Sequence, residues 1–520
     1  MSPKLKKHLP ILIILFISLV IGIFTFQDYG MTWDEYLYYQ YGEAVGYAYS
    51  IPERLSGDFD INRAYGPSIG DHKVYGPVYL LLTRIPVLAL RNITGLDIFS
   101  LWHLINFILF LVGIYFFYLL ALRWLKPQSA FWASLLYLTQ PLLWGHGFIN
   151  PKDIPFASIF IITIYYGFRL VDNFTTENVH PKKIDSSQLK RILLVGILIG
   201  IATNLRIIAP FIAALIFFYA LLQRKWRVTL WFIPIGAVAI ATLYLTWPYL
   251  WDAPIQNFLD VLARMSNNPT KLKVLFYGNE YRAYELPLRY LPVLLGVTLT
   301  EPVWILFTLG FGSAIARIWK KELDWQSLGV TFFWFAFMAG YILTVRPPMY
   351  DGFRHFLFIL PPIFILAGFG IEQILAWGKK PWLNTLVMLP LLFYGVRGII
   401  ALHPYEYAYY NQFVGGTSGA ESRFETDYWL TCYKEAVQEF STYTAGENAQ
   451  LRVYREEQNA AYYLPENIEI WLEPTAFETG DYLLLSARLD EVNMIQRKSS
   501  NIIEIGRDGA TFCAIREIAP

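Results

Sequence analysis

Cysteine is scarce in this chain: only Cys432 and Cys513 occur among 520 residues. Two thiols cannot build a zinc or multi-disulfide framework, but they can form one disulfide if both face an oxidising compartment. Charged residues are also few, at 16%, and they nearly cancel to a net charge of +1, so bulk charge indicates no nucleic-acid partner. The sequence has neither a fixed-period repeat nor a long low-complexity tract, which argues against a repeat array.

Long apolar runs are abundant instead. Hydrophobic residues make up 55% of the chain and aromatic residues 18%, and the mean hydropathy is +0.37. These values predict a polytopic α-helical membrane protein. About eleven runs approach the ~20 residues that a helix needs to cross a bilayer. They are Pro10–Phe26, Phe99–Leu122, Ser129–Gly145, Ile154–Val171, Arg191–Asn204, Ile207–Leu222, Val228–Tyr249, Pro302–Ile318, Leu328–Val345, Phe356–Ala376 and Trp382–Ile400.

Basic residues gather in alternate loops between these runs. Because positively charged loops stay inside, the N-terminus is predicted to be cytoplasmic in a multi-pass protein of the inner (cell) membrane. No small-residue cleavage site follows the first run, so an uncleaved signal anchor is expected. The basic loops contain Lys4, Lys6, Lys7, Arg123, Lys126, Lys182, Lys183, Lys190, Arg224, Lys225, Arg227, Lys320, Lys321, Lys379 and Lys380.

The remaining loops are predicted to lie on the extracytoplasmic face of a transmembrane catalytic domain, residues 1–400. They carry carboxylates, tyrosines and isolated cations, as expected for an enzyme whose site lies on one face. Two apolar stretches interrupted by proline, Val74–Leu90 and Leu286–Leu299, are expected to be helices lying in the interface. The outer loops cover residues 27–98, 147–153, 251–301 and 346–355.

Beyond residue 400 the composition changes. Residues 401–520 are predicted to form a small extracytoplasmic α/β domain, because the tail is long enough for its own core. A helix is expected over Asp427–Thr442. The expected strands are Gln450–Arg455, Ile468–Leu472, Tyr482–Ala487 and Ile502–Ile505.

Asp34 and Glu35 lie a few residues beyond the first apolar run, where carboxylates are costly to desolvate. One interpretation is a capping box, with Thr32 as N-cap and Glu35 at the third position of a helix that opens at Trp33. The capping box accounts for Glu35 but not for Asp34. The functional interpretation places both Asp34 and Glu35 among the catalytic residues, with Asp34 as a general base that takes the proton of an acceptor hydroxyl.

Asn150, Lys152 and Asp153 belong to the segment Asn150-Pro151-Lys152-Asp153 in the second outer loop. Asn-Pro commonly starts a turn, so a solvated polar turn is the simpler interpretation. Placement opposite the first loop favours a functional one. Asp153 would then orient the acceptor or Asp34, and Lys152 would meet a phosphate as a point charge.

Arg354 and His355 lead directly into an apolar run. Arginines at this depth are often lipid anchors, but a guanidinium also offers a fork of donors that suits a phosphate oxyanion. His355 adds another donor. Arg206, at the outer boundary of another run, carries the same two interpretations.

Three further residues are candidates for the cavity or the acceptor. Glu301 opens a predicted span, where the helix N-terminus alone favours a carboxylate. Tyr410 and Asn411 follow the last span. Tyrosines there normally form an interfacial belt, and sugar stacking is the alternative.

Taken together, these motifs resemble the GT-C class of glycosyltransferases. The similarity is to bacterial relatives of dolichyl-phosphate-mannose protein O-mannosyltransferases and of lipid A aminoarabinose transferases, and it covers roughly residues 1–400. It rests on Trp33-Asp34-Glu35, Asn150-Pro151-Lys152-Asp153, Thr300-Glu301-Pro302 and Arg354-His355.

The resemblance implies a polyprenyl-phosphate sugar donor and inverting transfer at the outer face. It also implies a base at Asp34, a second acid at Asp153 and phosphate contacts from Lys152, Arg354 and His355. The chain departs from the family pattern at the segment 71–77, where many relatives have a His-Pro-Pro-like motif.

The sequence therefore predicts an integral-membrane glycosyltransferase that moves a sugar to a hydroxyl of a protein, lipid or glycan acceptor. Charges at one face and the lack of matching halves argue against the first alternative, a secondary transporter. A ligase or polymerase of lipid-linked glycans is the second alternative. No cofactor is certain, although Asp34 and Asp153, with Glu35, have the chemistry to hold a divalent cation.

Overall fold

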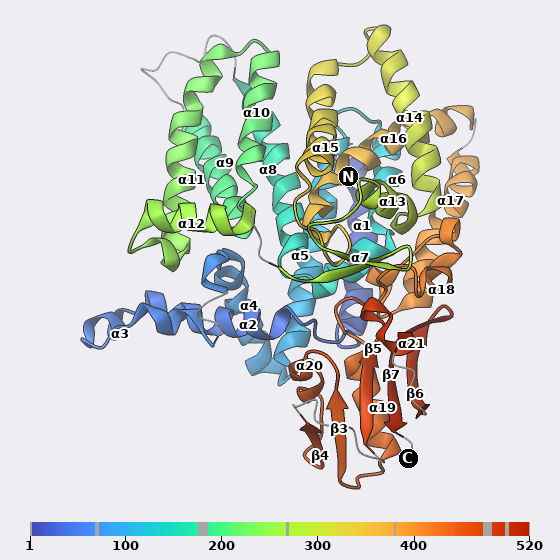
Figure 1. Cartoon of the computed structure of the whole chain (residues 1–520). Coiled ribbons are helices and arrows are strands. Elements are labelled where there is room, and N and C mark those ends of the chain that lie inside the picture. Colours follow the sequence, from blue (N-terminus) through green and yellow to red (C-terminus); the bar gives the residue numbers. More distant parts are fainter. Residues whose placement is uncertain are drawn as a thin grey trace.

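The computed structural model combines a helical bundle with a small β-sheet (Figure 1). It describes residues 3–67, 72–174, 186–266, 270–378, 381–471, 481–494 and 499–518. Within them, eight helical segments are long and apolar enough to cross a membrane. The helices are α1 (Pro3–Thr25), α5 (Ile98–Ala121), α8 (Asp153–Asn173), α9 (Ser186–Leu205), α11 (Phe232–Thr246, extended by a preceding 3₁₀ turn), α14 (Glu301–Trp319), α15 (Trp325–Val345) and α17 (Pro381–Leu402).

The other three expected spans take different forms. Two of them are shorter apolar helices, α10 (Pro210–Leu222) and α16 (Pro361–Trp377). The third, Ser129–Gly145, is not one helix but two, α6 (Pro127–Leu138) and α7 (Pro141–Ile149). Proline has no backbone N–H and clashes with the preceding turn, which is why the chain breaks before Pro141.

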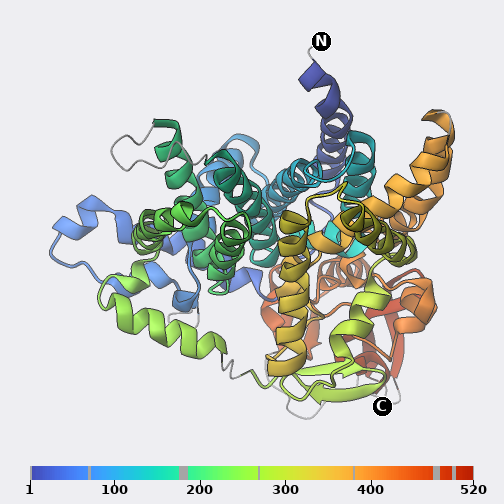
Figure 2. The ribbon, with the colours of Figure 1, turned by 90° about the horizontal axis from the view of Figure 1, so that it is seen from above.

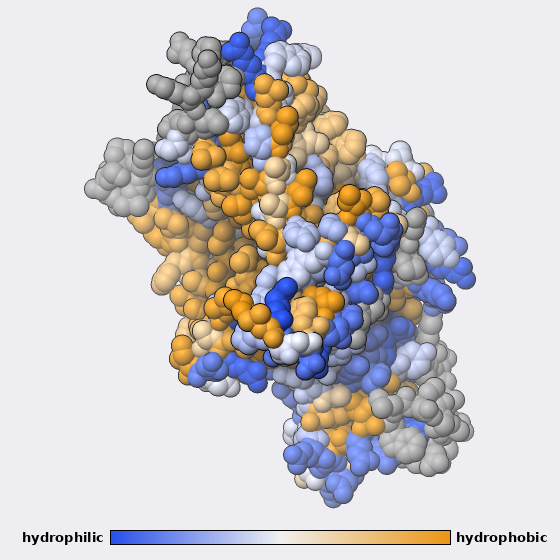
Figure 3. Space-filling model, turned by 90° about the vertical axis from the view of Figure 1, so that its left-hand side faces the viewer, coloured by the Kyte–Doolittle hydropathy of each residue, from blue (hydrophilic) through white to orange (hydrophobic). Residues whose placement is uncertain are grey.

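An apolar surface surrounds the bundle. On α11, the side chains of Ile233, Ile240 and Leu245 are 75%, 68% and 64% exposed. In Figure 3 such residues form a broad hydrophobic area over the upper part of the molecule, while the lower end is polar. Exposure of large aliphatic side chains on this scale is what a lipid-facing surface requires, so the chain is a polytopic membrane protein.

Several helices lie across the bundle axis rather than along it. In Figure 1 these include α2 (Glu35–Ala44), α3 (Ile51–Leu55) and α12 (Pro254–Ser266). The two stretches predicted as interfacial helices correspond to α4 (Val78–Thr94) and α13 (Tyr290–Thr298). Helix α12 and the short hairpin of β1 (Lys273–Phe276) and β2 (Asn279–Arg282) were not predicted from the sequence.

The C-terminal region contains a five-stranded sheet in the order β4-β3-β5-β7-β6. Strand β3 pairs parallel with β4 and β5, whereas β7 pairs antiparallel with β5 and β6. The strands are β3 (Ala449–Val453), β4 (Ile468–Trp471), β5 (Tyr482–Ser486), β6 (Ser499–Arg507) and β7 (Ala510–Ile518), and the helices are α18 (Gly416–Ala420), α19 (Tyr433–Tyr443), α20 (Glu457–Ala461) and α21 (Glu491–Met494).

The predicted strands match β3 to β6, except that residue 472 lies outside the described residues. The prediction missed β7, and the helix expected from Asp427 begins only at Tyr433. Asp427 instead accepts hydrogen bonds from the backbone N–H groups of Thr431 and Cys432, so it holds the turn before the helix. A disulfide joins Cys432 to Cys513 of β7.

The two parts lie end to end. The sheet lies at one end of the bundle and the α14–α15 turn, which carries Lys320 and Lys321, lies at the other (Figure 1). Seen from above in Figure 2, α1 lies at the edge of the bundle. The segments that carry Asp34, Lys152 and Arg354 meet at the end of the bundle that faces the sheet.

Candidate functional site

Asp34, Lys152 and Arg354 come together from three separate segments. Asp34 is the N-cap of α2, Lys152 precedes α8, and Arg354 begins the 3₁₀ helix η7 (Arg354–Ile359). Arg354 Nη2 lies 3.1 Å from Asp34 Oδ2, and Lys152 Nζ lies 3.7 Å from Asp34 Oδ1. The Asp34 side chain is 27% exposed, whereas both cations are buried. Asp34 is therefore the accessible member of a compact ionic cluster.

Asp153 forms the second carboxylate of this cluster. It is 3.4 Å from Arg354 Nη1 and pairs with Arg206. Asn150 fixes it at the start of α8, donating from Nδ2 to Asp153 Oδ2 at 3.0 Å and accepting from the Asp153 backbone N–H at 2.8 Å. Asn150 thus makes the turn that the simpler interpretation expected, and this turn aims Asp153 at the two arginines.

Asp351 is a third carboxylate on Arg354, and the sequence analysis did not single it out. Its Oδ2 lies 3.1 Å from Arg354 Nη2 and accepts a hydrogen bond from Trp429 Nε1, also at 3.1 Å. Asp351 has a φ of +55° and is fully buried. This left-handed backbone conformation costs energy for a non-glycine residue, and the ion pairs on the side chain offset that cost.

Arg488 brings the C-terminal region into the site. It is fully buried and donates from Nη1 to Asp351 Oδ1 at 2.6 Å and to the Tyr428 carbonyl oxygen at 2.7 Å. Its guanidinium carbon lies 4.2 Å from the ring centre of Trp33, the residue before Asp34. Arg488 therefore contacts both the loop that carries Arg354 and the segment that carries Asp34, although it lies more than 130 residues away from each of them in the sequence.

The charges around Asp34 keep it ionised. Partial burial opposes ionisation, but the Lys152 ammonium and the Arg354 guanidinium outweigh it and lower the pKa of Asp34 to about 2. At neutral pH the side chain is a carboxylate, which can accept a proton but not donate one.

Glu425 is in the opposite situation. It is buried, and neither of its carboxylate oxygens has a hydrogen-bond partner among the described residues. Arg488 Nη2 lies 3.8 Å away. Desolvation raises the pKa of Glu425 to about 8, against the attraction of Arg488. Glu425 is thus a buried acid that stays largely protonated at neutral pH and lies next to Arg488.

Glu35 points away from the cluster into a buried network. It accepts hydrogen bonds from the Thr32 backbone N–H at 2.7 Å and from the Tyr39 hydroxyl at 3.0 Å, and its Oε1 lies 3.0 Å from His103 Nε2. The bond to Thr32 is the backward half of the predicted capping box, but α2 begins at Glu35 rather than at Trp33. These contacts anchor α2 and so hold Asp34 in place.

His355 and Lys152 lie against aromatic rings. The His355 ring is 4.9 Å from the ring of Tyr350, and its Nδ1 is buried with no hydrogen-bond partner among the described residues. Lys152 Nζ is 4.8 Å from the ring centres of both Tyr38 and Tyr75. The segment 71–77 supplies Tyr75 to this cluster, although residue 71 lies outside the described residues.

Glu301 and Asn411 make structural contacts elsewhere. Glu301 Oε1 accepts the backbone N–H of Gln412 at 2.7 Å, next to the start of α14. Asn411 Nδ2 donates to the carbonyl oxygens of Gly296 and Leu299, both at 2.7 Å, and so closes the end of α13. No described contact joins either of them to Asp34.

Tyr410 lies closer to the cluster. Its hydroxyl donates to the Glu425 carbonyl oxygen at 2.8 Å, and its ring stacks on Phe424. Tyr410 also lines a small cavity together with Arg354 and Tyr428. Tyr410 is therefore a buried neighbour of Arg354 and not part of an interfacial belt, which is the usual place for tyrosines after a span.

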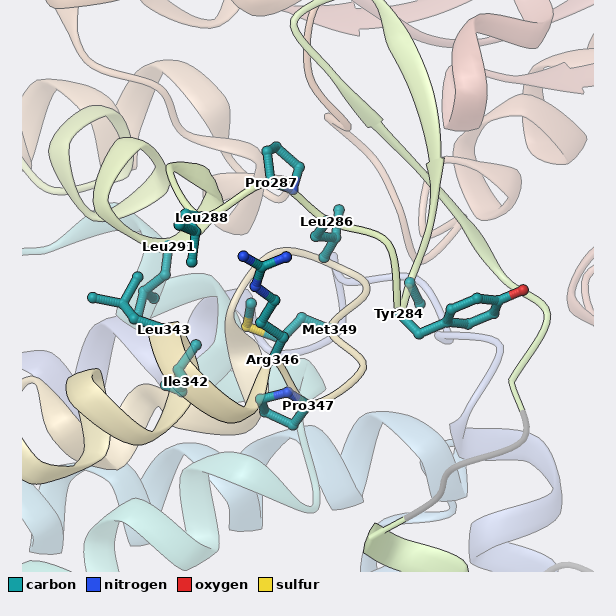
Figure 4. A pocket seen from close by; sticks show the side chains of 11 residues that line it. Tyr284, Leu286, Pro287, Leu288, Leu291, Ile342, Leu343, Arg346, Pro347 and Met349 are labelled. Carbon is teal, nitrogen blue, oxygen red and sulfur yellow. The ribbon is translucent and has the colours of Figure 1, made fainter.

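A separate apolar pocket borders the loop that carries Arg354. Figure 4 shows Arg346 among Leu286, Leu288, Leu291 and Met349, between the turn before α13 and the end of α15. The carboxylates described above do not line this pocket. It is a neighbour of the ionic cluster and not part of it.

The residues suggested for a divalent cation do not fit that role. Asp34 and Asp153 are both occupied by cationic side chains, and Glu35 points away from them. Across the described ranges, no cluster of three or more histidine, cysteine, aspartate or glutamate side chains has the arrangement to hold a metal ion. The opposing charge at the site comes from Arg354, Lys152 and Arg206.

The bundle, the crossing helices and the small C-terminal sheet together form a fold that occurs in solved membrane proteins. A solved structure that shares it is ArnT from Cupriavidus metallidurans in the apo state, with a TM-score of 0.51 and 11% identity over 97% of each chain. ArnT is a lipid A aminoarabinose transferase, one of the two groups that the sequence motifs resemble.

ArnT from the same organism has also been solved bound to undecaprenyl phosphate. That structure has a TM-score of 0.47 and 10% identity, again over 97% of each chain. No family model matches the sequence, and no curated protein matches it. At these identities the likeness establishes the fold, and function must be argued from the site.

Proposed function

We propose that the protein is an integral-membrane glycosyltransferase that uses a polyprenyl-phosphate sugar as donor. The acceptor is a hydroxyl of a protein, lipid or glycan, and the transfer takes place at the extracytoplasmic face of the inner membrane. The observation that carries the proposal is the contact of Asp34 with Arg354 and Lys152. The ArnT-like fold supports it.

Asp34 acts as general base. Its carboxylate takes the proton of the acceptor hydroxyl while the hydroxyl oxygen attacks the anomeric carbon of the donor. The bond between that carbon and the phosphate oxygen breaks in the same displacement, so the configuration inverts and polyprenyl phosphate leaves with the electron pair. Phosphate is already a good leaving group, so one base and a cationic environment are sufficient.

Lys152 and Arg354 stabilise the departing phosphate. An arginine fork matches two phosphate oxygens, and an ammonium adds a point charge. In the unliganded site these cations neutralise Asp34. When the donor phosphate engages them, Asp34 loses part of that compensation and its proton affinity rises, which makes it a better base at the moment of attack.

The remaining residues position this pair. Asp153 orients Arg354 and Arg206 toward the donor phosphate, and His355 adds a donor beside them. Asp351 contacts Arg354 directly, and Arg488 holds Asp351 in place. In this proposal the domain formed by 401–520 completes the site of the transmembrane domain formed by 1–400. The disulfide between Cys432 and Cys513 suits an extracytoplasmic location for it.

The test supplies the purified protein with a panel of polyprenyl-phosphate sugars and measures release of polyprenyl phosphate. Lys152→Gln is expected to raise KM for the active donor about tenfold or more, because it removes a phosphate contact worth about 1.4 kcal/mol. Lys271→Gln, an exposed lysine of another outer loop, serves as the matched control.

Three outcomes would overturn the proposal. They are no release from any donor, an equal effect of Lys271→Gln and Lys152→Gln, and sugar uptake into vesicles without transfer. The last result would favour a transporter.

A further inference from the structure

A basic cavity lies at the end of the bundle opposite the ionic cluster. It is about 310 Å³ in volume and opens between the start of α1, the end of α5 and the second half of α8. The Tyr118 hydroxyl donates to the Lys7 carbonyl oxygen at 2.7 Å, which ties α1 to α5 at this level. The lining residues are Lys7, His8, Leu119, Leu120, Leu122, Arg123, Tyr165, Phe168 and Arg169.

The cavity carries more positive charge than its own carboxylates neutralise. Arg123 pairs with Asp172 at 2.5 Å. Arg169 donates only to the Tyr165 hydroxyl, at 2.8 Å, and among the described residues neither it nor Lys7 is paired with a carboxylate. His8 Nδ1 is buried there without a hydrogen-bond partner in the described part of the chain. Among the described residues, the cavity wall thus has two cations with no carboxylate partner, Lys7 and Arg169. It also has one ring nitrogen with no hydrogen-bond partner, His8 Nδ1.

The lipid-facing side of α1 carries large apolar side chains. Leu12, Phe16 and Ile17 are 40%, 65% and 47% exposed, and they follow Lys7 by one to three turns on the same helix. Figure 2 places α1 at the edge of the bundle, where lipid reaches it. The cavity therefore lies beside a helix whose other side is exposed to lipid.

We propose that this cavity binds the headgroup phosphate of an anionic phospholipid from the surrounding bilayer. An isolated cation pair at a bilayer surface attracts anionic lipid, and basic pockets between membrane helices are suited to such headgroups. The volume is sufficient for a small polar group. By the charge distribution of the loops this is the cytoplasmic leaflet, so the site is separate from the proposed catalytic cluster and does not depend on it.

The test measures binding of phosphatidylglycerol to the full-length protein in neutral detergent, by native mass spectrometry and by thermal stability. Lys7→Gln/Arg169→Gln is expected to weaken phosphatidylglycerol binding roughly thirtyfold, because each cation near the membrane surface raises the affinity for anionic lipid about fivefold. The charge-conserving variant Lys7→Arg/Arg169→Lys should keep binding close to that of the wild type. This variant separates loss of charge from loss of fold.

Lys320→Gln/Lys321→Gln is the matched control, because it removes two exposed lysines from another loop at the same end of the bundle. The control should bind phosphatidylglycerol as the wild type does. Phosphatidylcholine and inorganic phosphate form the other arms, and neither should stabilise the protein at the same concentration. Equal loss in the control variant, equal stabilisation by phosphatidylcholine, or saturation by inorganic phosphate alone would overturn the proposal.

Discussion

Among single residues, Arg354 has the largest number of charged partners in the ionic cluster. It contacts Asp34 at 3.1 Å, Asp153 at 3.4 Å and Asp351 at 3.1 Å, and it is almost fully buried. One guanidinium thus contacts three carboxylates, each of which has one further cation as a partner: Lys152, Arg206 or Arg488. Removing one partner of a buried ion pair leaves a buried charge without compensation. The protein then loses more stability than the intact pair contributes.

Arg354→Gln is therefore expected to destabilise the protein by about 3–5 kcal/mol and to reduce sugar transfer at least 100-fold. Arg354→Lys keeps the charge but loses the fork, so its losses should be smaller in both measurements. Thermal unfolding and the release of polyprenyl phosphate report the two effects. Wild-type stability of Arg354→Gln would contradict the described contacts.

Glu425 gives a pH dependence whose sign follows from its environment. Burial raises the pKa of Glu425 to about 8, from an ordinary value of 4.5. Because the folded state holds the proton more tightly, the stability contributed by Glu425 is present below pH 4.5 and is lost as pH rises through 8. Glu425→Gln should remove this loss and flatten the fall of Tm between about pH 5 and 8. The exposed Glu466→Gln is the control, and an unchanged pH profile of Tm in Glu425→Gln would contradict the expectation.

At the scale of elements, the bundle depends on close helix contacts that use glycine. A Cβ atom on Gly310 of α14 would lie 1.7 Å from the Leu366 carbonyl oxygen of α16, and one on Gly370 would lie 2.2 Å from the Leu306 carbonyl oxygen. Small residues let the two backbones approach, which is a common basis of helix association in membranes. These contacts hold α16, which follows η7 and Arg354, against α14.

Gly310→Ala should separate α14 from α16 and cost about 1–3 kcal/mol. Gly312→Ala on the same helix is the matched control, because its added Cβ would meet no atom within 4 Å. The midpoint of thermal unfolding in one detergent compares the two variants. Equal midpoints would mean that the helices do not approach as described.

Much at this scale could be predicted from the sequence, because hydrophobic runs and basic loops are local signals. The predicted runs correspond to helices, and the motifs around Asp34, Lys152 and Arg354 lie together as expected. Pro141 was the local signal that one run is two helices. Strand β7 was missed because its alternation is interrupted by the polar pair Arg516-Glu517.

The parts of the site that could not be predicted come from distant segments. Arg488 reaches Asp351 and Trp33 only through the packing of the C-terminal sheet against the bundle, which no local pattern encodes. Glu35 was grouped with Asp34 by adjacency alone, but successive residues at a helix start point in different directions. The capping-box pattern in the sequence already indicated that Glu35 has a structural role at the start of the helix.

At the scale of the whole molecule, the C-terminal region serves the bundle rather than standing apart from it. Arg488→Met should lower kcat for sugar transfer about tenfold or more while KM for the donor changes little. The reason is that Asp351, which holds Arg354, and Trp33, which precedes Asp34, both lose their contact with Arg488. Arg488→Lys should recover part of kcat by keeping the charge beside Asp351. The exposed ion pair of Arg397 and Asp508 also joins the two parts, so Arg397→Met is the control. An equal loss in both variants would mean that Arg488 only fastens the domain.

The proposed mechanism depends on Asp34 acting as a base between two cations. The most direct measurement combines donor binding with single-turnover release of polyprenyl phosphate in Asp34→Asn. Removing the carboxylate frees Lys152 and Arg354 for the donor phosphate, so binding should be equal or tighter, while release should fall by about 10² to 10⁴. Release at the wild-type rate by Asp34→Asn, with the donor bound, would contradict the role of Asp34 as general base.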